Sequence, residues 1–227
     1  MNDGKTHLLL AASGSVALVK LRSIITSLDR PRARPLSIRI VLTESAARFF
    51  NGGAEEQPSL ATVASLPNVE GVHLNKDEWT DGWTRGGSIL HINLRKWADV
   101  MFIVPLSANT LAKLALGMSD NLLTSVVRAW DTTGLVDGKG TKRIVVAPAM
   151  NTAMWLHPIT AKQVKILEED WGVKDEVEMA TSAEHGGWFQ VLRPIEKALA
   201  CGDVGGGGMM EWKDIVKVIE ERLELLP

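Results

Sequence analysis

Three short segments of the chain combine small residues with hydroxyl or amide side chains, as ligand-binding turns do. They are Ser13-Gly14-Ser15-Val16, Ser107-Ala108-Asn109-Thr110 and Pro148-Ala149-Met150-Asn151. Each follows an apolar run and precedes a helical pattern, so each should lie where a strand ends and a helix begins. The free N–H groups of a helix N-terminus, with hydroxyls beside them, suit an anion. The three segments therefore predict a phosphate-bearing ligand, without identifying the nucleotide.

Two common nucleotide-binding signatures are missing from these turns. Gly14 has no glycine at the partner positions of the GxGxxG fingerprint, and no GxxxxGK[ST] occurs in the chain. Ordinary NAD binding and a P-loop ATPase are therefore disfavoured. For Ser13 to Ser15, a capping turn without a ligand explains the residues as well as a binding turn does.

His91 and Cys201 are the residues that could move protons. His91 lies between Leu90 and Ile92, which fits either a packed core histidine or a general base, because the pKa of histidine lies near neutrality. Cys201 is the only cysteine, which excludes an intrachain disulfide and a zinc site built from several thiolates. The other histidines are expected to be structural or solvated: His7, His73, His157 and His185.

Two more features allow both a structural and a functional interpretation. Four glycines, Gly205 to Gly208, permit any φ, which fits either a flap over a ligand or a flexible linker. Asn151 could cap a helix, or its amide could hold a substrate carboxylate. The residues alone leave both pairs of alternatives open.

Apolar runs alternate with helical patterns along the chain, which indicates a doubly wound parallel α/β sheet in a single domain, residues 1–227. In such a sheet ligands bind beyond the carboxyl ends of the strands, so the three turns should meet at one edge. Strands are expected at His7 to Ala12, Ser37 to Thr43, Val69 to Leu74, Val100 to Pro105, Ile144 to Ala147 and Val177 to Ala180. Helices are expected at Val16 to Leu28, Glu44 to Phe50, Leu94 to Trp97, Leu122 to Trp130, Asn151 to Asp170 and 212–226, and one opens at Ser107.

Composition excludes several classes of partner. Lys plus Arg is 25 and Asp plus Glu is 27, so a formal charge of −2 provides no general attraction for nucleic acid or anionic lipid. The apolar runs are far shorter than the roughly 18 residues that a membrane helix requires. The start, Met1 to Lys5, lacks the features of a signal peptide. We therefore expect a cytoplasmic protein with a small-molecule substrate and neither a nucleic-acid nor a membrane partner.

Four strings in this order, with the Ser-Gly-Ser turn, resemble the flavin-dependent cysteine decarboxylases over about residues 8–211. Each string is weakly specific alone, whereas the set leaves little room for accident. The resemblance implies a Rossmann-like, flavodoxin-type subunit that forms a homotrimer and binds FMN in a cleft shared between neighbouring subunits. The strings are Ile89 to Ile92, Pro105 to Thr110, Pro148 to Trp155 and Ala200 to Asp203.

The resemblance also implies roles for residues of this chain. His91 would be the active-site base and Cys201 the proton donor on the flap. Ala198 stands where plant relatives have an arginine, so phosphate contacts there are expected to differ. The substrate would be bound by Asn151, through its cysteine carboxylate, and by Met154, Ala200 and Met209. FMN would contact Gly14, Ser15, Val16, Ser45, Ser107, Ala108, Asn109, Thr110 and Ala149.

The reaction implied by the resemblance is the FMN-dependent decarboxylation of 4'-phosphopantothenoylcysteine to 4'-phosphopantetheine in coenzyme A synthesis, through a thioaldehyde and an enethiolate. The C=S group supplies the electron sink that a simple cysteine carboxylate lacks. Fungal relatives of this fold act as inhibitory subunits of a protein phosphatase, and peptidyl-cysteine decarboxylases and flavin prenyltransferases share it. The presence of His91, Asn151 and Cys201 in one chain favours the decarboxylase, with a protein phosphatase kept as a second partner.

Overall fold

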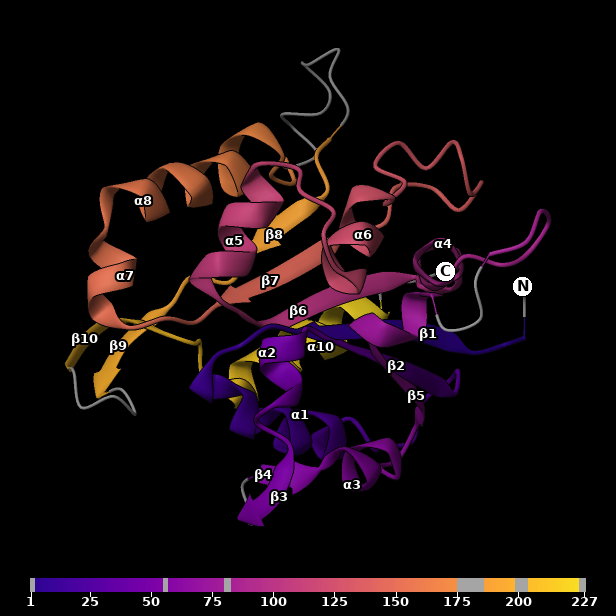
Figure 1. Ribbon diagram of the computed structural model, residues 1–227, viewed down its shortest axis with the longest axis horizontal. Helices are drawn as coiled ribbons and strands as arrows, with labels where there is room; N and C mark the ends of the chain where they lie inside the picture. The colour runs from indigo at the N-terminus through magenta and orange to yellow at the C-terminus, as the bar shows by residue number, and fades with distance from the viewer. Residues whose placement is uncertain (1–2, 55–56, 80–82, 175–185, 199–203, 225–227) are drawn as a thin grey trace.

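A computed structural model describes residues 3–54, 57–79, 83–174, 186–198 and 204–224. At its centre is a six-stranded sheet in the order β5-β2-β1-β6-β7-β8, in which all neighbouring strands are parallel (Figure 1). Numbered only among themselves, these strands follow the Rossmann order 3-2-1-4-5-6. Their bounds are β1 Thr6–Ala12, β2 Leu36–Leu42, β5 Val69–Leu74, β6 Val100–Leu106, β7 Ile144–Pro148 and β8 Phe189–Val191.

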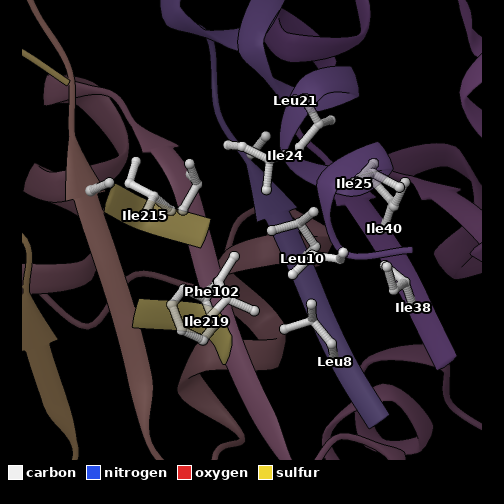
Figure 2. Packing of buried hydrophobic residues seen from close by; sticks show 14 of the residues in the cluster. Leu8, Leu10, Leu21, Ile24, Ile25, Ile38, Ile40, Phe102, Ile215 and Ile219 are labelled. Atoms are coloured by element: carbon white, nitrogen blue, oxygen red, sulfur yellow. The ribbon is translucent and has the colours of Figure 1, made fainter. Parts of the chain in front are cut away.

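Helices cover both faces of the sheet, which explains the unbroken apolar runs of its strands. Successive side chains of a strand point to opposite faces. In β1, Leu8 and Leu10 belong to one buried cluster and Leu9 to the other. Figure 2 shows the first cluster, where Ile219 of the closing helix lies beside Phe102 of β6. Because β1 is buried on both sides, its residues from Leu8 to Ala12 are apolar at successive positions.

The helices form two layers, one for each hydrophobic cluster. The first layer contains α1 Leu21–Ser27, α2 Glu44–Ala47, α3 Leu60–Ala64 and α10 Trp212–Glu224. The second contains α4 Leu90–Trp97, α5 Ala108–Ala115, α6 Leu122–Arg128 and α8 Pro158–Lys165, with α7 Thr152–Leu156 preceding α8. None of the helices in the described ranges is both long and apolar enough to cross a membrane.

Short elements complete the described chain. Two 3₁₀ helices, η1 Val16–Lys20 and η2 Asn75–Trp79, follow β1 and β5, and a π-helical turn, η3 Ile166–Asp170, follows α8. Two antiparallel hairpins lie outside the main sheet. They are formed by β3 Asn51–Ala54 with β4 Gln57–Ser59, and by β9 Ile195–Ala198 with β10 Val204–Gly208.

The structure confirms the doubly wound parallel sheet, and β5 has the predicted bounds. The sixth strand is β8, whereas the expected strand at Val177 to Ala180 lies outside the described residues. The helix expected at Leu94 to Trp97 begins at Leu90, so His91 lies in its first turn. The four glycines are part of β10 and pair with β9, so the segment is an ordered hairpin strand and the linker interpretation is wrong.

Candidate active site

A cavity of about 580 Å³ lies at the carboxyl edge of the sheet, beyond the ends of β1 and β6. β1 pairs with β2 on one side and with β6 on the other, so the direction in which strands are added to the sheet reverses between β1 and β6. Doubly wound sheets bind ligands at such switch points. Its volume is in the range of small-molecule and cofactor sites. Eleven residues with a predicted role lie on its wall: Gly14, Ser15, Val16, Ser45, Ser107, Ala108, Asn109, Ala149, Asn151, Met154 and Met209.

Ser13 joins the turns that follow β1 and β6. Its hydroxyl is buried, donates to the carbonyl oxygen of Pro105 at 3.1 Å and accepts the N–H of Ser107 at 2.7 Å. The next residue, Gly14, lies so close to Ser45 that a Cβ at position 14 would be 2.6 Å from the Ser45 Oγ. The close approach of the turn after β1 to Ser45, which follows β2, therefore requires glycine at position 14.

Ser107 caps the helix α5, which begins at the cavity. Its Oγ accepts the N–H of Thr110 at 3.3 Å, as an N-cap serine does. Thr110 itself is buried and does not line the cavity; its N–H and its hydroxyl both contact Ser107. The structure thus gives Thr110 a contact with the capping residue, and its contact with FMN stays a prediction.

Asn151 caps a helix and also lies on the cavity wall, so the cap does not exclude the predicted contact with a substrate carboxylate. Its Oδ1 accepts the N–H of Met154 at 2.9 Å and caps α7. Within the described part of the chain, no acceptor contacts its Nδ2 group, and the residue lies on the cavity wall. The helix cap therefore leaves both amide hydrogens available to a ligand.

The glycine-rich strand β10 forms part of the cavity wall. The carbonyl oxygen of Gly207 accepts the N–H of Met150 at 2.9 Å, which joins β10 to the end of β7. Gly207 has φ of 101°, and a Cβ there would lie 2.7 Å from the Met150 carbonyl oxygen. This position needs glycine both for its backbone conformation and for the close approach. The role of the segment as a flap stays a prediction.

Several wall residues were outside the predicted set. In a 3₁₀ helix the side chains three positions apart lie on one face, and η1 places Val16 with Val19, and Ala17 with Lys20, on the wall. Lys20 is the one cation among the wall residues that the structure describes. The other additions are Met210, Glu211 and Trp212, whereas Met150, Gly207 and Gly208 lie in segments already expected at the ligand.

His91 lies apart from this cavity. It is absent from the cavity wall and occupies the first turn of α4, which Figure 1 shows at the right of the view, with α7 and β10 at the left. Its Nδ1 is 2.7 Å from Oε1 of Glu78 in η2, and its side chain is 22% exposed. The cavity and the predicted base are therefore separate within one subunit. Ala200 and Cys201 lie outside the described residues.

The fold and the cavity agree with the comparison with known families. The family Flavoprotein matches residues 1–224, so the chain belongs to the flavoprotein family. A protein of Arabidopsis thaliana named probable phosphopantothenoylcysteine decarboxylase is 39% identical over 207 residues, which cover 91% of this chain and 83% of the relative. This family membership covers nearly the whole chain.

Two solved structures share the fold over nearly their whole length. A PPC decarboxylase mutant complexed with pantothenoylaminoethenethiol is 35% identical, with a TM-score of 0.72 and coverage of 97% of this chain and 99% of that chain. The FMN binding protein AtHal3 is 36% identical, with a TM-score of 0.69 and coverage of 97% of both chains.

Four yeast relatives, between 34% and 38% identical, are much longer than this chain, which spans only 30% to 41% of their length. One, from Schizosaccharomyces pombe, is named probable thymidylate synthase. Another, from Saccharomyces cerevisiae, is named coenzyme A biosynthesis protein 3.

Proposed function

We propose that this chain is the catalytic subunit of an FMN-dependent decarboxylase that converts 4'-phosphopantothenoylcysteine to 4'-phosphopantetheine. The observation that carries the proposal is the single cavity at the β1 and β6 ends, which brings together the Ser-Gly-Ser turn, the Ser107 turn and Asn151. The names of the similar plant protein and of the solved decarboxylase complex support this reaction.

The cavity fits a flavin mononucleotide. Ala149, Met150 and Met209 give it an apolar side that suits a flat aromatic ring, and the backbone at Gly14 is open to close approach. Lys20 supplies a positive charge for a phosphate. When bound, the flavin supplies reversible two-electron chemistry, which provides the electron sink needed for loss of CO₂.

Three residues of the chain supply binding and proton transfer in this proposal. The Nδ2 group of Asn151 donates to the substrate carboxylate, because its Oδ1 is already used by the helix cap. His91 removes a proton from the substrate, as a histidine can near neutral pH. Cys201, in the part of the chain outside the described residues, donates a proton to the product.

We further propose that the subunits form a homotrimer in which His91 of one subunit faces the cavity of a neighbour. The separation of His91 from the cavity of its own subunit supports this arrangement. Light scattering tests it: a mass near three times 24.7 kDa supports the trimer, and a monomeric mass contradicts a shared site. A cytoplasmic location stays a prediction from the sequence.

The deciding experiment is incubation of the purified, FMN-loaded protein with phosphopantothenoylcysteine. Release of CO₂ together with 4'-phosphopantetheine is expected. A cysteine without the phosphopantothenoyl group serves as the matched control and should remain unchanged. If the substrate is untouched while a protein phosphatase is inhibited, the regulatory alternative replaces this proposal.

A further inference from the structure

Glu78 is a buried carboxylate that contacts His91. Its side chain is 6% exposed, and its Oε1 lies 2.7 Å from Nδ1 of His91. Its second oxygen, Oε2, is buried and has no hydrogen-bond partner in the described part of the chain. His91 is thus the polar group that this carboxylate contacts most directly.

The backbone around Glu78 is held in place by neighbouring contacts. Asp77 accepts the N–H of Leu74 at 2.7 Å, which closes the turn between β5 and η2. Asn75 accepts the N–H of Leu122 at 2.9 Å, which ties η2 to α6. The carboxylate of Glu78 is therefore presented to His91 from a fixed segment.

The chemistry of the pair determines which nitrogen carries the proton. An ionised carboxylate only accepts hydrogen bonds, so Nδ1 of His91 must be the donor and Nε2 keeps its lone pair. We propose that Glu78 is a positioning residue that holds His91 in the Nδ1–H tautomer, with Nε2 directed to accept the substrate proton. This inference rests on the proposed function only for the role of His91 as a base.

Other charged groups around α4 have partners of their own. Arg95, one turn after His91, lies 3.0 Å from Asp137 and also contacts the carbonyl oxygen of Ala129. The carboxylate of Asp77 accepts the backbone bond of Leu74. Glu78 is therefore the charged side chain that acts on the His91 ring directly.

His73, a partly buried histidine in the strand before η2, provides a comparison with His91. Its Nε2 is buried and has no hydrogen-bond partner among the described residues, and burial lowers its pKa from the usual value. His73 lies in β5, which leads into η2. His73 therefore lacks the carboxylate contact that Glu78 gives to His91.

The direct test is ¹⁵N NMR of the full protein labelled at histidine, at a pH where the imidazoles are neutral. Wild-type His91 should be the Nδ1–H tautomer. In Glu78→Gln the amide can donate to Nδ1, so the Nε2–H tautomer should rise to about half or more, as expected when the carboxylate partner of a histidine is replaced by an amide. Glu220→Gln is the matched control. Glu220 lies on α10, away from His91, and its carboxylate is 2.6 Å from the guanidinium group of Arg32.

Kinetics of the FMN-loaded enzyme provide the second readout. Glu78→Gln should lower kcat by about 10- to 100-fold, as loss of an orienting partner does, with KM changed less than about twofold. Glu78→Asp keeps the charge and should recover part of kcat, and thermal unfolding checks that each variant is folded.

The two readouts separate the possible failures. The inference is overturned if wild-type His91 is the Nε2–H tautomer, or if the tautomer is unchanged in Glu78→Gln. The wild-type result decides even if the variant does not fold. If the wild type lacks decarboxylase activity, the proposed function fails while the NMR result still decides the role of Glu78.

Discussion

The cavity and the surroundings of His91 differ in what fills them. The cavity is walled by glycine, serine, alanine and methionine, with Lys20 as its one cation among the described wall residues. Around His91 the polar side chains contact one another: Glu78 contacts His91, and Asp137 lies 3.0 Å from both Arg95 and Lys142. One region leaves room for a large ligand, whereas the other is filled by side chains that contact each other.

This difference shows how binding and proton transfer are divided. Small side chains at the strand ends allow backbone and hydroxyl groups to approach a ligand closely, as Gly14 and Ser13 do. A general base needs instead a fixed ring and a defined tautomer, which a buried carboxylate provides. Variants in the two regions should therefore fail in different measurements.

The largest effect is expected from His91→Asn. Turnover should fall by about 10²- to 10⁴-fold because the proton acceptor is lost, whereas FMN binding should change much less, because the wall residues proposed to hold FMN all belong to the subunit that carries the cavity. Steady-state kinetics and fluorescence titration with FMN measure the two quantities. His157→Asn is the control, since His157 is exposed and an asparagine can also cap α8. Retained turnover in His91→Asn would remove His91 from the mechanism.

Next in size is Asn151→Asp, which keeps the oxygen that caps α7 but places a negative charge where the substrate carboxylate should bind. The value of kcat/KM should fall by about 10- to 150-fold, the size expected when a hydrogen bond to a charged group is lost. Asn151→Ser caps the helix without adding charge and should fall between the wild type and the aspartate variant. Equal kinetics in all three proteins would contradict carboxylate binding.

Ser13→Ala should lower the stability of the cavity region by about 1–3 kcal/mol, because the N–H of Ser107 loses its acceptor. Urea unfolding followed by circular dichroism measures the change. Ser119→Ala is the control, since the Ser119 hydroxyl is exposed and contacts Ser125 at the surface. An equal loss of unfolding free energy in both variants would show that the buried Ser13 contacts stabilise the protein no more than an exposed hydroxyl contact does.

The smallest effect concerns the pH dependence of stability and His73, which lies in β5 just before η2. Burial lowers the pKa of His73, so below about pH 6.5 the unfolded chain takes up a proton that the folded chain does not. The free energy of unfolding should therefore fall as pH decreases, by at most about 1.4 kcal/mol per pH unit from this group. His73→Asn should reduce that slope, whereas His157→Asn should not. If the pH dependence of unfolding is unchanged in His73→Asn, a group other than His73 causes it.

The buried strands could be predicted from the sequence because hydrophobic patterning determines them. Val69 to Leu74 matches β5, and the turns at Gly14, Ser107 and Asn151 meet because parallel strands end at one edge. Ser107 and Asn151 also cap the helices that follow them, a local signal that needs no tertiary information, whereas Ser15 makes no capping bond with its side chain.

Other features depend on tertiary contacts that leave no pattern. β8, with three residues, is short for a strand, and apart from a single bridge to Gly172 it pairs with β7 at the sheet edge among the described residues. Gly205 to Gly208 have no side chains to show periodicity, and the order of β10 comes from pairing with β9 and from Met150. The contact between Glu78 and His91 joins residues 13 positions apart across an irregular segment. Spacing alone could not identify that partner.

The capped side chain of Asn151 has a further consequence for binding. Holding a mobile polar side chain in one rotamer costs about 0.5–1.5 kcal/mol when a ligand imposes it. Here the bond to Met154 imposes it as α7 folds, before any ligand arrives. The rotational entropy of this amide is lost once, during folding, so a carboxylate that meets it gains nearly the full strength of the contact.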